Sequence, residues 1–168
     1  MKTILCFFTF IICLPFYGQQ ELTQEDWQSD LRFLQETIHT EYPFLFKKVT
    51  PQQFDTAVEE LNQAIPALED HEIVVGFGRI VALFKYGHTD ISFRTGPVDF
   101  HKLPLVIYEF KDGVYITGTH KDYKEVLGAR IVALEGVPIE DVFKAVYPAI
   151  PMENDYYFKA YGLSLIHI

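Results

Sequence analysis

The residue best suited to chemistry is His88, in the tripeptide Gly87-His88-Thr89. An imidazole can accept and release a proton near neutral pH, so a histidine held in place can act as a general base. A histidine in this position also has a structural interpretation. It could cap the preceding helix or bond a nearby carbonyl, because helix C-termini favour cationic side chains. The spacing alone leaves both interpretations open.

Thr89 and Asp90 are candidates for orienting the His88 imidazole, through a hydroxyl and a carboxylate. The simpler expectation is that Thr89 bonds its own backbone and that strand alternation turns Asp90 away. Neither later serine, Ser92 or Ser164, lies in a sequence context typical of a nucleophile.

No metal or cofactor site is expected. The histidines are dispersed, without a His-x-x-x-His pair on a helix. Gly76-Phe77-Gly78 lacks the further glycine and the lysine of a phosphate loop. Both cysteines, Cys6 and Cys13, lie in the N-terminal leader, which excludes disulfides and cysteine-based zinc sites from the mature chain.

The element that must position His88 is a long apolar helix. Asp70 is its expected N-cap and Gly87 its expected end, and Ile91-Ser92-Phe93 then begins to alternate as a strand. The apolar residues between them recur at helical spacing: Ile73, Val74, Phe77, Ile80, Val81 and Phe84.

Two earlier helices are predicted from their ends. Thr23 to Asp26 forms a capping-box-like start, and Pro43 follows the end of that helix. Thr50 caps the second helix, Pro51 occupies its first position and Pro66 stops it. Three helices joined by short turns predict a small antiparallel bundle over residues 19–94.

The second half is predicted to be rich in strands, over residues 95–162. Residues 103–110 and 114–117 flank the turn 111–113, and the strand 129–134 leads to the turn Glu135-Gly136. Pro138 then opens a helix. The segment 95–102 is the expected linker. Helices followed by strands predict an α+β fold.

The N-terminus has the layout of a secretory signal peptide over residues 1–18, with Lys2, an apolar run and a small residue at Gly18. An uncleaved anchor is disfavoured by Pro15, and a lipoprotein anchor at Cys13 by the bulky residues before it. We expect a periplasmic or secreted protein with no stable membrane span after leader cleavage. The net charge of −9 argues against nucleic-acid binding.

The last six residues, 163–168, resemble a translated sequencing-adapter sequence. We expect them to be a non-native tail, and the chain to be an N-terminal fragment. The alternative is an ordinary short apolar strand.

The order of these motifs resembles the N-terminal half of the tail-specific (C-terminal-processing, tricorn-core-like) serine peptidases. Glu135 stands where that family usually has Asn. The resemblance extends over nearly the whole mature chain, to Gly162. The segments that carry it are 27–31, 42–46, Gly87-His88-Thr89, 103–105, 111–115 and 127–139.

The resemblance implies a three-helix domain followed by a PDZ-like module, with the catalytic αβ core absent. It also implies that His88 is the general base for a serine outside this chain, acting on a polypeptide. In the branch of the family that uses a Ser-Lys pair, His88 would be structural.

The leading hypothesis is therefore a fragment of an exported serine-type peptidase that is inactive by itself. The alternative is a non-catalytic exported module that binds peptides. The sequence assigns no peptide-binding residues and no oligomeric state.

Overall fold

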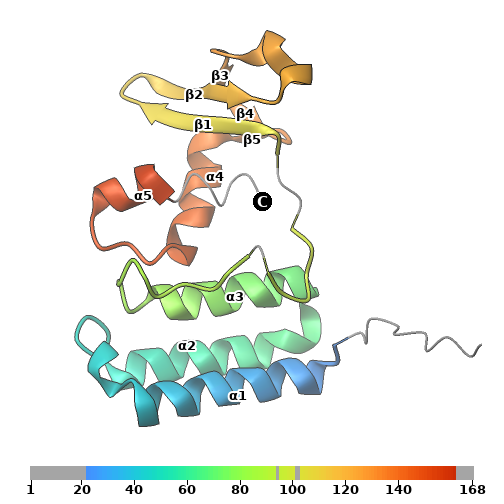
Figure 1. Cartoon of the computed structure of the whole chain (residues 1–168). Coiled ribbons are helices and arrows are strands. Elements are labelled where there is room, and N and C mark those ends of the chain that lie inside the picture. Colours follow the sequence, from blue (N-terminus) through green and yellow to red (C-terminus); the bar gives the residue numbers. More distant parts are fainter. Residues whose placement is uncertain (1–21, 94, 101–102, 162–168) are drawn as a thin grey trace, which may run out of the picture.

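The computed structural model describes residues 22–93, 95–100 and 103–161. Helices α1 (Gln24–Glu41), α2 (Pro51–Ala64) and α3 (Asp70–Ala82) lie side by side in the lower half of Figure 1. The strands and the two shorter C-terminal helices form the upper half. The described part of the chain therefore mixes helices with small antiparallel sheets, which confirms the predicted α+β class.

Local sequence fixes where the first two helices begin. Thr23 caps α1 in a capping box with Asp26, whose carboxylate accepts a 2.9 Å hydrogen bond from the Thr23 amide. Thr50 and Gln53 form the same arrangement at α2. Both predicted starts are confirmed, because each cap satisfies amides that the first helical turn leaves without partners.

The third helix differs from its prediction at both ends. Glu69, not Asp70, is the N-cap, and Asp70 instead accepts a 2.8 Å hydrogen bond from the Trp27 indole. The helix ends at Ala82, before the predicted Gly87. Its end is followed by tightened i→i+3 hydrogen bonds and by a positive φ of 54° at Lys85.

Phe84 explains the early end of α3. Its side chain is fully buried and packs against Phe54, with ring centroids 5.3 Å apart, and against Phe46. Burying a phenylalanine stabilises the fold by about 1.5–3 kcal/mol, and this burial favours the turn that the backbone takes after Ala82. The predicted strand over residues 91–93 is also wrong. Ile91 and Phe93 instead pack on the core of the helical half.

The upper half contains a three-stranded sheet in the order β1-β2-β3 and a separate two-stranded one, β4-β5. β1 and β2 form the predicted hairpin, with Ile107 opposite Ile116. The elements are β1 (Leu105–Phe110), β2 (Gly113–Thr119), β3 (Arg130–Ile131), β4 (Ala133–Leu134), β5 (Val137–Pro138), α4 (Ile139–Val146) and α5 (Asp155–Tyr161).

The strand predicted over residues 129–134 is divided between the two sheets. Val132 lies at the division, 70% exposed, and its carbonyl accepts a hydrogen bond from the Ile139 amide. The predicted turn is confirmed: Glu135 and Gly136 have φ of 48° and 83° and join β4 to β5. Positive φ at both central residues is the geometry of a type I′ turn, one of the two favoured turns of a two-residue hairpin.

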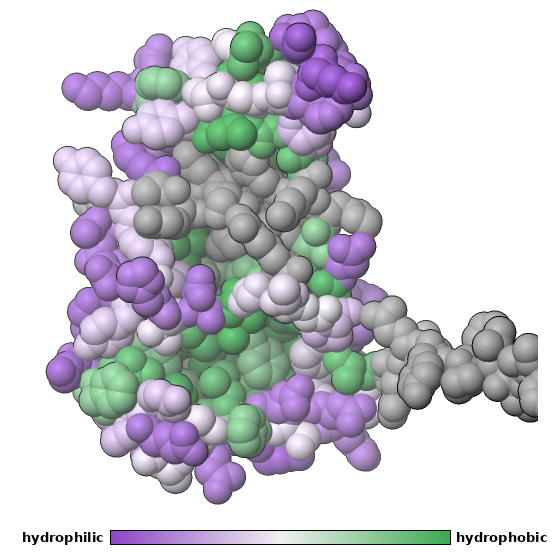
Figure 2. Space-filling model, viewed as in Figure 1, coloured by the Kyte–Doolittle hydropathy of each residue, from purple (hydrophilic) through white to green (hydrophobic). Residues whose placement is uncertain are grey.

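The described residues form two apolar cores, one above the other in the view of Figure 1. The lower core is formed by α1–α3 and the segments that follow them, and the upper core by the hairpin, α4 and α5. The 3-10 helix η4 (Tyr147–Ala149) packs against α3 and connects the halves. Figure 2 shows apolar residues on the same face over both halves. In the described ranges, no helix combines the length and the apolar composition needed to cross a bilayer.

Phe54 and Phe33 offer a matched test of the lower core. Phe54, on α2, is fully buried, whereas Phe33, on α1, is 71% exposed. We expect Phe54→Ala to lower the free energy of unfolding by about 3–5 kcal/mol, because it removes ring contacts and leaves a cavity. Phe33→Ala should change it by less than about 0.5 kcal/mol. Urea denaturation followed by circular dichroism measures both, and equal losses would contradict this description of the core.

Candidate functional site

His88 lies on an exposed turn, and its neighbour Gly87 is buried. The turn is closed by the Thr89 amide, which donates a 2.9 Å hydrogen bond to the Tyr86 carbonyl. Within the described residues, the His88 imidazole has no hydrogen-bond or ion-pair partner. The backbone is therefore fixed while the ring stays available to solvent.

The backbone of Gly87 is bonded on both sides by the C-terminal segment. Its amide donates a 3.0 Å hydrogen bond to Glu153 Oε1, and its carbonyl accepts one from the Tyr157 hydroxyl. These residues are 66 and 70 positions away in the chain. We call these two hydrogen bonds the Gly87 clamp.

Glycine is required at this position by the closeness of the tyrosine ring. A Cβ added to Gly87 would lie 2.9 Å from Tyr157 Cζ and closer still to another ring carbon. Real Cβ atoms essentially never approach carbon so closely. Close packing against Tyr157, and not the end of a helix, therefore accounts for the glycine at position 87.

The start of the turn is anchored from the other side by Lys48. Its ammonium donates a 2.8 Å hydrogen bond to the Lys85 carbonyl and lies 4.8 Å from the centroid of the Tyr86 ring. A cation over an aromatic face contributes about 0.5–1 kcal/mol at an exposed site. Lys48 and the Gly87 clamp together hold residues 85–87, which leaves His88 little backbone freedom.

The other site residues predicted from sequence do not contact the ring. Across the described ranges, neither Thr89 nor Asp90 forms a side-chain hydrogen bond or ion pair with His88. Their orienting roles stay predictions. Ser92 Oγ accepts a 3.0 Å hydrogen bond from Thr95. Ser164, Cys6 and Cys13, the leader and the tail 163–168 lie outside the described residues.

A second histidine pairs with a carboxylate in a way that sequence spacing did not reveal. His39 Nε2 on α1 lies 2.7 Å from Asp55 Oδ1 on α2, and Gln35 donates a 2.7 Å hydrogen bond to the same oxygen. Partial burial raises the pKa of Asp55. The hydrogen bonds from Gln35 and His39, with the histidine charge, outweigh it, so the pKa lies below its ordinary value.

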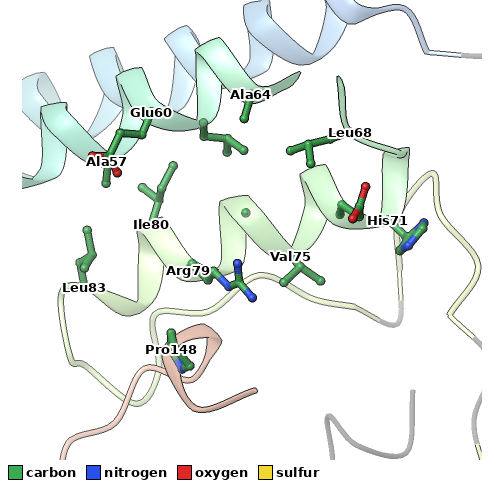
Figure 3. A pocket seen from close by; sticks show the side chains of 13 residues that line it. Ala57, Glu60, Ala64, Leu68, His71, Val75, Arg79, Ile80, Leu83 and Pro148 are labelled. Atoms are coloured by element: carbon green, nitrogen blue, oxygen red, sulfur yellow. The ribbon is translucent and has the colours of Figure 1, made fainter. Parts of the chain in front are cut away.

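Three hollows are lined by residues of the described ranges, and His88 lines none of these three. One of them, about 550 Å³, runs between α2 and α3 to Pro148, as Figure 3 shows. A second, about 430 Å³, lies between the β1-β2 turn, β3 and α4, and a third, about 310 Å³, between α3 and α4. Among the described side chains, no group of three or more His, Cys, Asp or Glu is placed to hold a metal ion.

Comparison of the chain with protein-family models, curated proteins and solved structures finds no match. The resemblance to the tail-specific peptidases therefore rests on the quoted motifs alone. The site is characterised by its own geometry, an exposed imidazole on a turn held by the Gly87 clamp.

Gly87 and Gly96 provide a matched test of the clamp. Gly87→Ala places a methyl group against the Tyr157 ring, and we expect it to destabilise the chain by about 1–3 kcal/mol through forced repacking. Gly96→Ala meets nothing within 4 Å and should be close to neutral. Thermal or urea unfolding compares the two, and a neutral Gly87→Ala would show that the tyrosine does not pack here.

The Asp55 carboxylate predicts a pH dependence of stability. Because its folded pKa is lowered, it contributes stability above its unfolded pKa of about 3.9, and this stability is lost as pH falls through the folded value. We expect Asp55→Asn to make the loss of stability below about pH 4 less steep. Urea midpoints at several pH values measure it. Asp30→Asn, at an exposed position on α1, is the control and should leave the slope unchanged.

Proposed function

We propose that the chain is the N-terminal part of an exported serine-type peptidase and that His88 is its general base. One observation carries the proposal. The imidazole of His88 is exposed and unbonded within the described residues, while the turn beneath it is held by the Gly87 clamp. A structural histidine would ordinarily use its ring nitrogens to bond its surroundings.

The proposed chemistry needs a hydroxyl nucleophile from a part of the protein beyond this chain. A serine hydroxyl is a weak nucleophile at neutral pH, so a base must accept its proton as the oxygen attacks the peptide carbonyl. His88 would accept that proton on a ring nitrogen and return it to the leaving amine. A fixed backbone helps, because catalysis requires the base within hydrogen-bond reach of the hydroxyl.

The proposal assigns the two halves of the fold to different tasks. Residues 19–94 would form a three-helix bundle that presents His88, and residues 95–162 a PDZ-like module that engages a polypeptide. The leader, residues 1–18, would direct the protein to the periplasm or the exterior. The present chain by itself would be inactive, because the nucleophile is supplied from elsewhere.

A non-catalytic peptide-binding module is the second candidate function, and the free edge of β1 favours it. In the described ranges, β1 pairs with β2 on one side only, so the backbone groups of its other edge are available to an added strand. This candidate needs no general base. It predicts peptide binding that is independent of His88.

The test uses the protein extended to the natural stop codon of its gene, assayed with a fluorogenic peptide. We expect His88→Ala to lower kcat by about 10²–10⁴-fold, the range of a general base, with the free energy of unfolding unchanged within about 0.5 kcal/mol. His71→Ala, at an exposed histidine at the start of α3, is the control and should keep full activity.

Two outcomes would overturn the peptidase proposal. Retained turnover in His88→Ala would remove the general base. Peptide binding without hydrolysis by the extended protein would favour the binding module instead.

A further inference from the structure

The hollow between α3 and α4 has the composition of a small-molecule site. It measures about 310 Å³, near the lower limit of ligand pockets, which are mostly apolar with a few polar groups that fix orientation. Among the described residues that line it, Arg79 carries the only charge, and the others are apolar: Val75, Phe93, Phe100, Ala145, Val146 and Ala149.

The walls of this hollow are fixed by packing that the structure describes. Phe93 sits directly on α3, so that a Cβ added to Gly78 would lie 2.8 Å from its Cζ. Phe100 meets Phe93 edge-on, with ring centroids 5.6 Å apart, and Ala149 is buried at the junction with α3. The hollow is therefore preformed, which lowers the entropic cost of filling it.

Arg79, which is exposed, lines this hollow and also lines the groove between α2 and α3. In Figure 3, Arg79 and Val75 extend from α3 on the side where Pro148 lies. The same groove is lined by Glu60 and Glu72, yet within the described residues the Arg79 guanidinium has no hydrogen bond or ion pair. Its donors are available to a ligand.

We propose that the hollow binds an apolar molecule that ends in a carboxylate, with its chain between Phe93 and Val146 and its carboxylate on Arg79. A guanidinium holds a carboxylate through two parallel hydrogen bonds, which are stronger than bonds between neutral groups. This site is separate from His88 and does not depend on the peptidase proposal.

The alternative is a purely structural arginine. Arg79 lies in the last turn of α3, where a cation stabilises the carbonyl end of the helix. The two interpretations differ in the quantity that a change of Arg79 would alter. A structural role affects unfolding, whereas a ligand-binding role affects the affinity for carboxylates and not for the matching alcohols.

The test is isothermal titration calorimetry of the chain with decanoate, 1-decanol and decylamine. We expect decanoate to bind at least about tenfold more tightly than 1-decanol, which lacks the charge, and decylamine to bind most weakly. Arg79→Met should lower the decanoate affinity at least about tenfold while leaving that for 1-decanol unchanged. Arg32→Met, at an exposed arginine on α1, is the matched control and should bind as the parent does.

A second variant tests the apolar part of the site. Ala145 is exposed on α4 and lines the hollow, so Ala145→Trp should fill it and weaken binding of decanoate and 1-decanol alike. A tri-leucine peptide with a free carboxyl end, compared with its amide, tests whether the bound carboxylate belongs to a peptide or to a fatty acid. Tighter binding than decanoate indicates a peptide end, and weaker binding a fatty acid. Equal affinity of decanoate for the parent and Arg79→Met, or no binding of any probe, would overturn the proposal.

Discussion

The hydrogen bonds of the Gly87 clamp are the constraint on which the candidate site depends. They join the loop after α3 to a segment 66 to 70 residues further along the chain, and so fix the lower half of the fold against the upper half. The buried Gly87 exchanges water for these two partners, and a buried amide or carbonyl without a partner would cost about 1–3 kcal/mol. Losing either partner would therefore loosen both the contact between the halves and the turn that carries His88. The position of the imidazole is a property of the whole chain and not of α3 alone.

Much of the fold could be predicted because it is decided by neighbouring residues. The caps at Thr23 and Thr50 act within three positions, and the turn at Glu135 and Gly136 depends on two residues that accept positive φ. The β1-β2 hairpin follows from alternation and a short turn. In each case the interaction that stabilises the element lies within the segment that the pattern describes, so tertiary packing only has to agree with it.

The predictions that were wrong share the opposite cause, because contacts with residues far away in the sequence decide those parts of the fold. The pattern of α3 continues past Ala82 because Phe84 is apolar at helical spacing, but its ring is buried against α2 and the loop before it. Periodicity records that a residue is apolar and not which partner buries it. Residues 91–93 alternate like a strand but have no strand to pair with, and they pack on helices instead. Of the residues in the candidate site, the sequence pointed only to His88, whose role stays a prediction. Glu153 and Tyr157, which hold it, are far away in sequence and carry no local signal, and the same is true of His39 and Asp55 on separate helices.

His88 and Arg79 are both without partners in the described residues, yet the two observations carry different weight. An exposed polar or charged side chain without a partner is hydrated by water, so the missing partner costs little free energy and by itself indicates no function. What distinguishes each is the order around it. The turn under His88 is bonded from two directions, and Arg79 borders a hollow whose aromatic walls are packed on α3. In a chain with 23 acidic side chains against 14 basic ones, partners for a guanidinium are plentiful, and two of them, Glu60 and Glu72, line the neighbouring groove between α2 and α3. Arg79 thus combines well-packed surroundings with a guanidinium that has no partner among the described residues. This arrangement is expected where a ligand supplies the partner, because preorganised groups lose less entropy when they bind.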